Sequence, residues 1–142
     1  MKWFFDTSVL IPVFLEDHTH HEHSLAVFIL ANKKDACCAA HSLAEVYATM
    51  TRLPGRHRLS GDQVLLFLEA IEERLTVIGL DTHEYYSVIK EAAGNGIVGG
   101  TIYDALLARC ALKAQAATIY TWNAEHFRRL SPEVARRVKS PW

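Results

Sequence analysis

The chain has 142 residues, which predicts a single domain spanning residues 1–142. Half of the residues are hydrophobic and 22% are charged, which excludes extended disorder, because disordered chains lack the apolar surface that offsets the entropy of ordering. Fifteen Lys and Arg residues against sixteen Asp and Glu residues give a net charge of −1. A nucleic-acid site must therefore be local, because the surface as a whole does not attract phosphates.

Cysteine usage and the apolar segments bear on where the protein resides. Cys37, Cys38 and Cys110 are few, odd in number and without Cys-x-x-Cys spacing, so we expect inert core thiols in a reducing compartment. Asp6 interrupts the apolar N-terminal stretch, and no small-residue cleavage site follows it. No window approaches the ~20 apolar residues of a membrane span. We therefore expect a cytoplasmic protein that contacts no membrane.

Short apolar runs alternate along the chain with longer segments of helical periodicity. Leu25, Phe28 and Ile29, for example, recur at the spacing of one helix face. Strands that alternate with helices predict right-handed crossovers and a parallel sheet covered on both faces, with functional sites beyond the carboxyl ends of the strands. The predicted strands are 3–5, 36–40, 75–80 and 118–121, and the predicted helices are 9–15, 24–33, 42–52, 60–73, 82–93, 100–115 and 132–138.

Four polar side chains are predicted at that edge of the sheet. Asp6 ends the first strand, Glu45 lies in the first turn of the helix after the second strand, and Asp104 lies near the start of the helix before the fourth. Asn123 follows the fourth strand. Converging carboxylates raise each other's pKa unless a cation neutralises them, and oxygen ligands select Mg²⁺ or Mn²⁺. An ion held in this way activates water for attack on a phosphodiester.

Each of these residues also has an ordinary structural interpretation. Asp6 has the position of a helix N-cap, and Ser42 and Glu45 have the spacing of a capping box. Asp104 lies among Ala and Leu residues, where an unpaired carboxylate is costly, so its presence favours a function. Asn123 is weak evidence by itself, because Asn is common after strands. Their shared edge is what makes the functional interpretation the stronger one.

Four segments spread over nearly the whole length carry a family resemblance: FFDTSVLI, HSLAEVYATMTRL, GGTIYDALLARCA and TIYTWNAEHF. In this order they resemble the PIN-domain ribonucleases, specifically the VapC-type toxins of toxin–antitoxin pairs. The resemblance implies a PIN-like three-layer α/β/α fold around a short central parallel sheet. It also implies endoribonuclease activity that depends on Mg²⁺ or Mn²⁺, inhibition by a cognate antitoxin protein, and a homodimer.

The resemblance also assigns roles to residues. It maps the catalytic, metal-binding triad onto the three carboxylates named above and a supporting hydroxyl onto Ser8. Many members have an Asp where Asn123 stands, after a Thr such as Thr121, so Asn123 joins the catalytic set and Thr121 the supporting one. Asn is a neutral oxygen ligand, and this departure weakens the case for a second tightly held ion without removing the first.

Histidines and tryptophans form a second group of candidates. The stretch HTHHEH at 18–23 contains His20 and His23 one helical turn apart, which is compatible with a zinc site. A solvated loop and helix start is the favoured interpretation, because no cysteine or distant ligand accompanies them. We expect Trp3 in the core, since it belongs to the first strand, whereas Trp122 could line the cleft.

Basic residues give a weak prediction of RNA contacts. Arg52, Arg56 and Arg58 surround a Pro-Gly turn in RLPGRHR, which is either a solvated turn or a phosphate-contacting loop. The arginine pairs at 128–129 and 136–137 could serve similarly, or could pair with acidic residues of an antitoxin.

The leading hypothesis is a metal-dependent endoribonuclease whose products carry 5′-phosphate and 3′-hydroxyl ends. A non-catalytic PIN-like module that binds RNA or protein is the alternative, and it would bind without cleavage and without sensitivity to chelators. A phosphatase with Asp6 as nucleophile is disfavoured, because that chemistry usually needs a second acid two residues later, where Ser8 stands.

Overall fold

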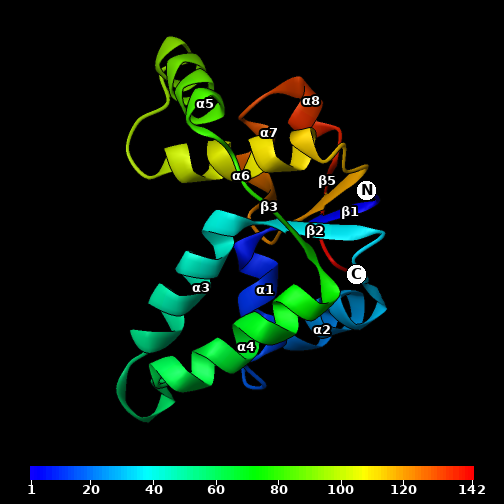
Figure 1. The fold of residues 1–142 in the computed structure, drawn as a ribbon, viewed down its shortest axis with the longest axis vertical. Coiled ribbons are helices and arrows are strands. Elements are labelled where there is room, and N and C mark those ends of the chain that lie inside the picture. Colours follow the sequence, from blue (N-terminus) through cyan, green and yellow to red (C-terminus); the bar gives the residue numbers. More distant parts are fainter.

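A five-stranded sheet forms the centre of the computed structural model, which describes residues 1–142 (Figure 1). The strands are β1 (Trp3–Phe5), β2 (Ala36–Ala39), β3 (Thr76–Ile78), β4 (Thr118–Tyr120) and β5 (Val138–Lys139). Their order is β3-β2-β1-β4-β5, and every neighbouring pair is parallel. The predicted parallel sheet is confirmed, and its carboxyl ends share one edge.

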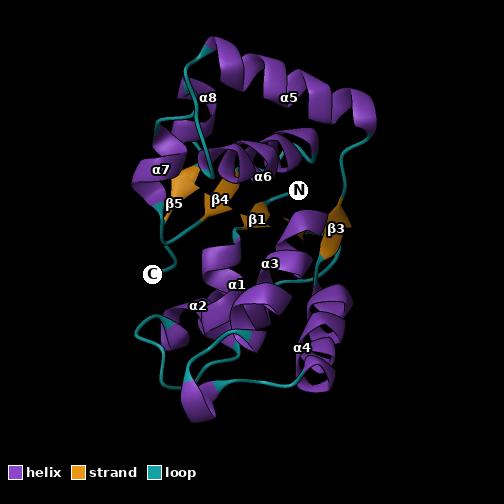
Figure 2. Cartoon of the chain, turned by 90° about the vertical axis from the view of Figure 1, so that its left-hand side faces the viewer, coloured by secondary structure: helices purple, strands orange, loops and turns teal.

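Helices cover both faces of this sheet, which confirms the three-layer α/β/α architecture (Figures 1 and 2). In both views one group of four helices lies below the sheet and a second group lies above it, with α5 packed on the outside of α6. No helix combines the length and the hydropathy of a membrane span. The lower group is α1 (Thr7–Val13), α2 (His21–Leu30), α3 (Ala40–Thr51) and α4 (Gly61–Arg74); the upper group is α5 (Thr82–Gly94), α6 (Thr101–Lys113), α7 (Ala124–Arg128) and α8 (Pro132–Ala135).

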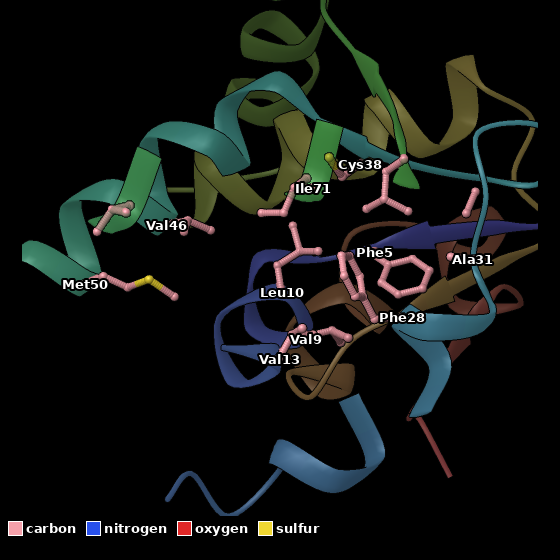
Figure 3. Packing of buried hydrophobic residues seen from close by; sticks show 13 residues of the cluster. Phe5, Val9, Leu10, Val13, Phe28, Ala31, Cys38, Val46, Met50 and Ile71 are labelled. Atoms are coloured by element: carbon pink, nitrogen blue, oxygen red, sulfur yellow. The ribbon is translucent and has the colours of Figure 1, made fainter. Parts of the chain in front are cut away.

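The strands bury side chains on both faces, as alternation along a strand requires. Phe5 belongs to the core between the sheet and α1–α4, whereas Phe4 belongs to the core under α6–α8. Figure 3 shows the first of these cores, in which Leu10 and Phe28 pack against Phe5 and Ile71 reaches in from α4. Two cores on one sheet fix the register of the central strands, because a slip by one residue would exchange their faces.

The cysteines are core residues, as predicted. All three are free and buried. Burial raises the pKa of Cys37 and Cys110 to about 11 and that of Cys38 to about 12. The protonated thiol therefore dominates at neutral pH, and reactivity is low because the thiolate is the nucleophile.

The boundaries differ from prediction in the regions of weakest periodicity. The helix predicted at 24–33 covers 21–30 instead, and the helix predicted at 132–138 ends at Ala135. Val138 and Lys139 form β5 by pairing with β4, and α7 was not predicted. The two residues of β5 and the five of α7 form no apolar run or helical periodicity of their own, so pairing and packing with distant segments determine these elements. The helix predicted at 60–73 is confirmed as α4, and Ser60 and Gln63 form a capping box at its start.

Candidate functional site

Asp6 follows β1 and is only 3% exposed. Its Oδ2 accepts hydrogen bonds from Ser8 Oγ at 2.7 Å and from Thr121 Oγ1 at 2.8 Å. Asp6 occupies the N-cap position of α1, as the helix-cap interpretation predicts, but its side chain makes no capping hydrogen bond and binds the two hydroxyls instead. Burial raises the pKa of Asp6, and the two hydroxyl donors only partly offset that rise.

The two hydroxyls that hold Asp6 also hold the turn after β4. Ser8 Oγ accepts from the Trp122 backbone amide at 2.9 Å, and Thr121 Oγ1 accepts from the Asn123 amide at 2.9 Å. Each hydroxyl thus uses its proton on the carboxylate and a lone pair on a backbone amide. These hydrogen bonds join the end of β1 and the start of α1 to the β4–α7 turn. The two regions are more than 110 positions apart in the sequence.

Glu45 lies on α3 and is half-buried. Its Oε1 accepts from Thr7 Oγ1 at 2.9 Å, and the same hydroxyl lies 2.8 Å from Ser42 Oγ. The helix starts with Ala39 as its N-cap residue and has no side-chain cap, so the capping-box interpretation of Ser42 and Glu45 is wrong. The carboxylate of Glu45 instead faces the residue that follows Asp6.

Asp104 lies in the first turn of α6 and is the residue with the most informative electrostatics. Its pKa is raised to about 6, first by burial and then by the charges of Asp6 and Glu45, with His126 acting in the opposite direction. Asp104 Oδ2 lies 3.9 Å from His126 Nδ1 on α7. Sequence reasoning did not single out His126, because only tertiary packing of α7 on α6 shows that it lies beside a carboxylate.

A hard cation fits the chemistry of this donor set. Asp6 and Asp104 have raised pKa values, which means that their charges lack sufficient compensation within the protein. No three His, Cys, Asp or Glu side chains lie close enough to hold one ion together, and repulsion between carboxylates opposes such an approach. The fit therefore rests on the oxygen donors and their electrostatics rather than on a closed coordination cage.

Asn123 is connected to the network through its backbone only. It occupies the N-cap position of α7, is exposed, and makes no side-chain capping bond. Its amide binds Thr121 as described above. The amide group of its side chain therefore lies at the surface beside the carboxylates' network rather than within it.

The arginines of RLPGRHR lie outside the acidic group. Arg52, Arg56 and Arg58 are exposed around the short 3₁₀ turn Gly55–His57, and Arg58 Nε donates to the Leu53 carbonyl at 3.2 Å. Arg52 follows Glu45 by seven residues of helix, which is about 10 Å at 1.5 Å per residue. Any contact of these side chains with RNA would thus concern nucleotides away from the carboxylates.

The histidine-rich stretch is packed against tryptophans rather than fully solvated. The His20 ring stacks on Trp122 with centroids 3.8 Å apart and planes at 8°, and His23 lies edge-on to Trp142. Trp122 Nε1 donates to the buried hydroxyl of Ser24 on α2 at 2.9 Å. The predicted loop and helix start is confirmed, because α2 begins at His21, but His20 and His21 are half-buried and the Trp122 ring packs on α2. These histidines lie in no group of three metal-ligating side chains, so the zinc site is not supported. Trp3 is half-buried against the core, in agreement with prediction.

A parallel α/β/α sandwich with acidic residues at the carboxyl edge of its sheet defines the structural class. The PIN domain family matches residues 3–131, and the chain belongs to this family. It is 33% identical to Ribonuclease VapC40 of Mycobacterium tuberculosis over 132 aligned residues. The alignment covers 91% of this chain and 94% of that protein. The fold is similar to that of VapC20 of M. tuberculosis, described as a sarcin-ricin loop cleaving toxin (TM-score 0.71, 11% identity, 88% and 92% of the two chains). It is also similar to VapBC2 of Rickettsia felis, solved with a DNA fragment of its promoter (TM-score 0.66, 18% identity, 99% and 98%).

Proposed function

We propose that this protein is a Mg²⁺- or Mn²⁺-dependent endoribonuclease and the toxin component of a toxin–antitoxin pair, with Asp6, Glu45 and Asp104 as metal ligands. Membership of the PIN family and the likeness to Ribonuclease VapC40 support this proposal. The observation that carries it is the raised pKa of Asp104, because two further carboxylates and burial act together on one side chain at the edge where such folds bind ligands.

Other residues of the chain would orient the carboxylates that bind the ion. A divalent ion bound there would neutralise the carboxylates, activate water and stabilise the charge that develops at the phosphorus. Ser8 and Thr121 hold Asp6 in one orientation, and Thr7 holds Glu45. We infer that Asn123 contributes a neutral oxygen at the rim of this site.

The proposal extends to partners and location. We infer an RNA substrate, with Arg52, Arg56 and Arg58 contacting phosphates away from the scissile one. A cognate antitoxin and a homodimer follow from the VapC resemblance, and the cytoplasm is the compartment in which three free, buried thiols are unremarkable. The exposed arginines at 128–129 are candidates for ion pairs with an antitoxin.

Cleavage of RNA by the purified protein tests this function. We expect Mn²⁺-dependent products with 5′-phosphate ends, and no products with excess EDTA. Asp104→Asn keeps the shape and removes the charge, and Glu69→Gln on the exposed face of α4 is the matched control. Cleavage that survives EDTA, or that Asp104→Asn leaves intact, would contradict the proposal. RNA binding without cleavage by the wild type would favour the non-catalytic module.

A further inference from the structure

An aromatic pair joins the two helices that carry Glu45 and Asp104. The rings of His41 on α3 and Tyr103 on α6 are stacked, with centroids 5.1 Å apart and planes at 11°. The two helices lie on opposite sides of the sheet (Figure 2), so the rings meet beyond its edge rather than across its face. Neither residue belongs to either hydrophobic core.

The pair borders the acidic site. His41 precedes Glu45 by four residues, so both side chains project from the same face of α3, one turn apart. Tyr103 directly precedes Asp104 on α6. Tyr103 is 48% exposed, so solvent reaches its ring although His41 stacks on it. A partly exposed aromatic ring thus joins the two helices at positions adjacent to Glu45 and Asp104.

The proposed activity requires that the site hold RNA beside the scissile bond, and an aromatic ring can do this. The proposed ion would neutralise the carboxylates and attract the scissile phosphate, but it offers nothing to the bases. The net charge of the chain is −1, and the nearest arginine of the RLPGRHR loop lies about 10 Å along α3 from Glu45. Holding a nucleotide beside the scissile bond therefore has to rely largely on uncharged contacts. Stacking of a base on an aromatic ring supplies such a contact, and it tolerates any sequence because every base has a π-face.

We propose that His41 and Tyr103 form a nucleobase-stacking site, which holds one base of single-stranded RNA on the exposed face of Tyr103 beside the carboxylates. This inference rests on the proposed function in that it names how the same site positions its substrate. Its competitor is a purely structural role, in which the stack only ties α3 to α6.

The experiment compares two ligands of equal charge: an oligouridine of about 8 nucleotides, and a ribose–phosphate chain of the same length without bases. Dissociation constants are measured by fluorescence anisotropy in Ca²⁺ for the wild type, Tyr103→Leu, His41→Leu and Tyr103→Phe. We expect Tyr103→Leu to weaken oligouridine binding by about 10-fold and to change binding of the base-free chain by less than about 2-fold. His41→Leu should have the same selectivity with a smaller effect, and Tyr103→Phe should match the wild type because it keeps the ring.

The outcomes separate the alternatives. Equal weakening of both ligands by Tyr103→Leu would overturn the stacking site in favour of a structural role, and so would unchanged binding of both. Wild-type protein that fails to bind oligouridine would overturn it as well. If the base-dependent loss is present but the wild type cleaves no RNA with Mn²⁺, the stacking site stands and the proposed nuclease function fails. If cleavage is present and the base-dependent loss is absent, only the stacking site fails.

Discussion

Asp6 and Asp104 lie at the same edge of the sheet but in contrasting surroundings. Asp6 is 3% exposed, and two hydroxyls bind the same carboxylate oxygen. Asp104 is half-buried, and its Oδ2 lies 3.9 Å from Nδ1 of His126. The Asp6 carboxylate is held by hydroxyls from two segments, α1 and the turn after β4, whereas the Asp104 carboxylate is partly exposed in the first turn of α6 and feels the charges of Asp6 and Glu45.

The contrast shows how one site combines orientation with access. Hydroxyl donors stabilise the ionised form of Asp6, so part of the cost of burial is met by geometry. Asp104 lacks such donors, and its pKa of about 6 reflects that cost directly. We infer that Asp6 has a fixed orientation in the site. We also infer that a bound cation would be stabilised most by the Asp104 carboxylate, whose charge has the least compensation within the protein.

The largest predicted effect follows from neutralising any one of the three carboxylates. Asp6→Asn, Glu45→Gln and Asp104→Asn should each lower Mn²⁺-dependent RNA cleavage at least ~100-fold, which is a loss of about 2.7 kcal/mol of transition-state stabilisation. Single-turnover rates at saturating Mn²⁺ measure this, with Glu69→Gln as the control. A variant that retains more than a tenth of the wild-type rate would remove that residue from the triad.

The second prediction concerns the hydroxyls that hold Asp6. Ser8→Ala and Thr121→Val each remove one of the two hydroxyl donors to the buried Asp6 carboxylate and leave a backbone amide without its partner, so the free energy of unfolding should fall by roughly 1–3 kcal/mol. Urea denaturation measures the change. Thr49→Val, the same substitution at an exposed position of α3, should change it by less than about 0.5 kcal/mol. An equally small loss at Thr121 would mean that Asp6 does not depend on this donor.

The third prediction concerns Asp104 and the dependence of stability on pH. The folded chain raises the pKa of Asp104 from 3.8 to about 6, so between these values it binds a proton more tightly than the unfolded chain. Stability from this group is therefore present at low pH and is lost as pH rises through about 6. Asp104→Asn should stabilise the metal-free protein by about 1–2 kcal/mol at pH 7.5, allowing for partial solvation, and the gain should vanish below about pH 4.

Thermal unfolding of the metal-free protein and of Asp104→Asn across this pH range measures how stability depends on the ionisation of Asp104. Asp17→Asn is the control, because Asp17 is exposed in the loop after α1. A stability gain for Asp104→Asn that does not depend on pH would show that the effect comes from packing and not from the charge.

The smallest predicted effect concerns Asn123 at the rim. Asn123→Asp adds a negative charge near the proposed ion, so the Mn²⁺ concentration for half-maximal cleavage should fall by roughly 3- to 10-fold, or about 0.6–1.4 kcal/mol. Asn123→Ala is the companion variant and should raise that concentration if the amide oxygen takes part. Titration curves for both variants that superimpose on the wild-type curve would exclude Asn123 from the site.

The sequence predicts the sheet edge well because strand ends are local features. Asp6 and the residues after β4 follow apolar runs, and parallel pairing then brings them to one edge whatever the details of packing. The sequence does not predict β5 or the position of His126, because two-residue pairing and the packing of α7 depend on contacts between distant segments. The His20–Trp122 stack escapes prediction for the same reason, since it joins positions about a hundred residues apart.

Isothermal titration of Mn²⁺ into the wild type, Asp6→Asn, Glu45→Gln, Asp104→Asn and Glu69→Gln tests most directly whether these three carboxylates form a metal site. Each triad variant should bind Mn²⁺ at least ~10-fold more weakly than the wild type, and Glu69→Gln should bind with wild-type affinity. Unchanged Mn²⁺ affinity in all three triad variants would contradict the assignment of the site.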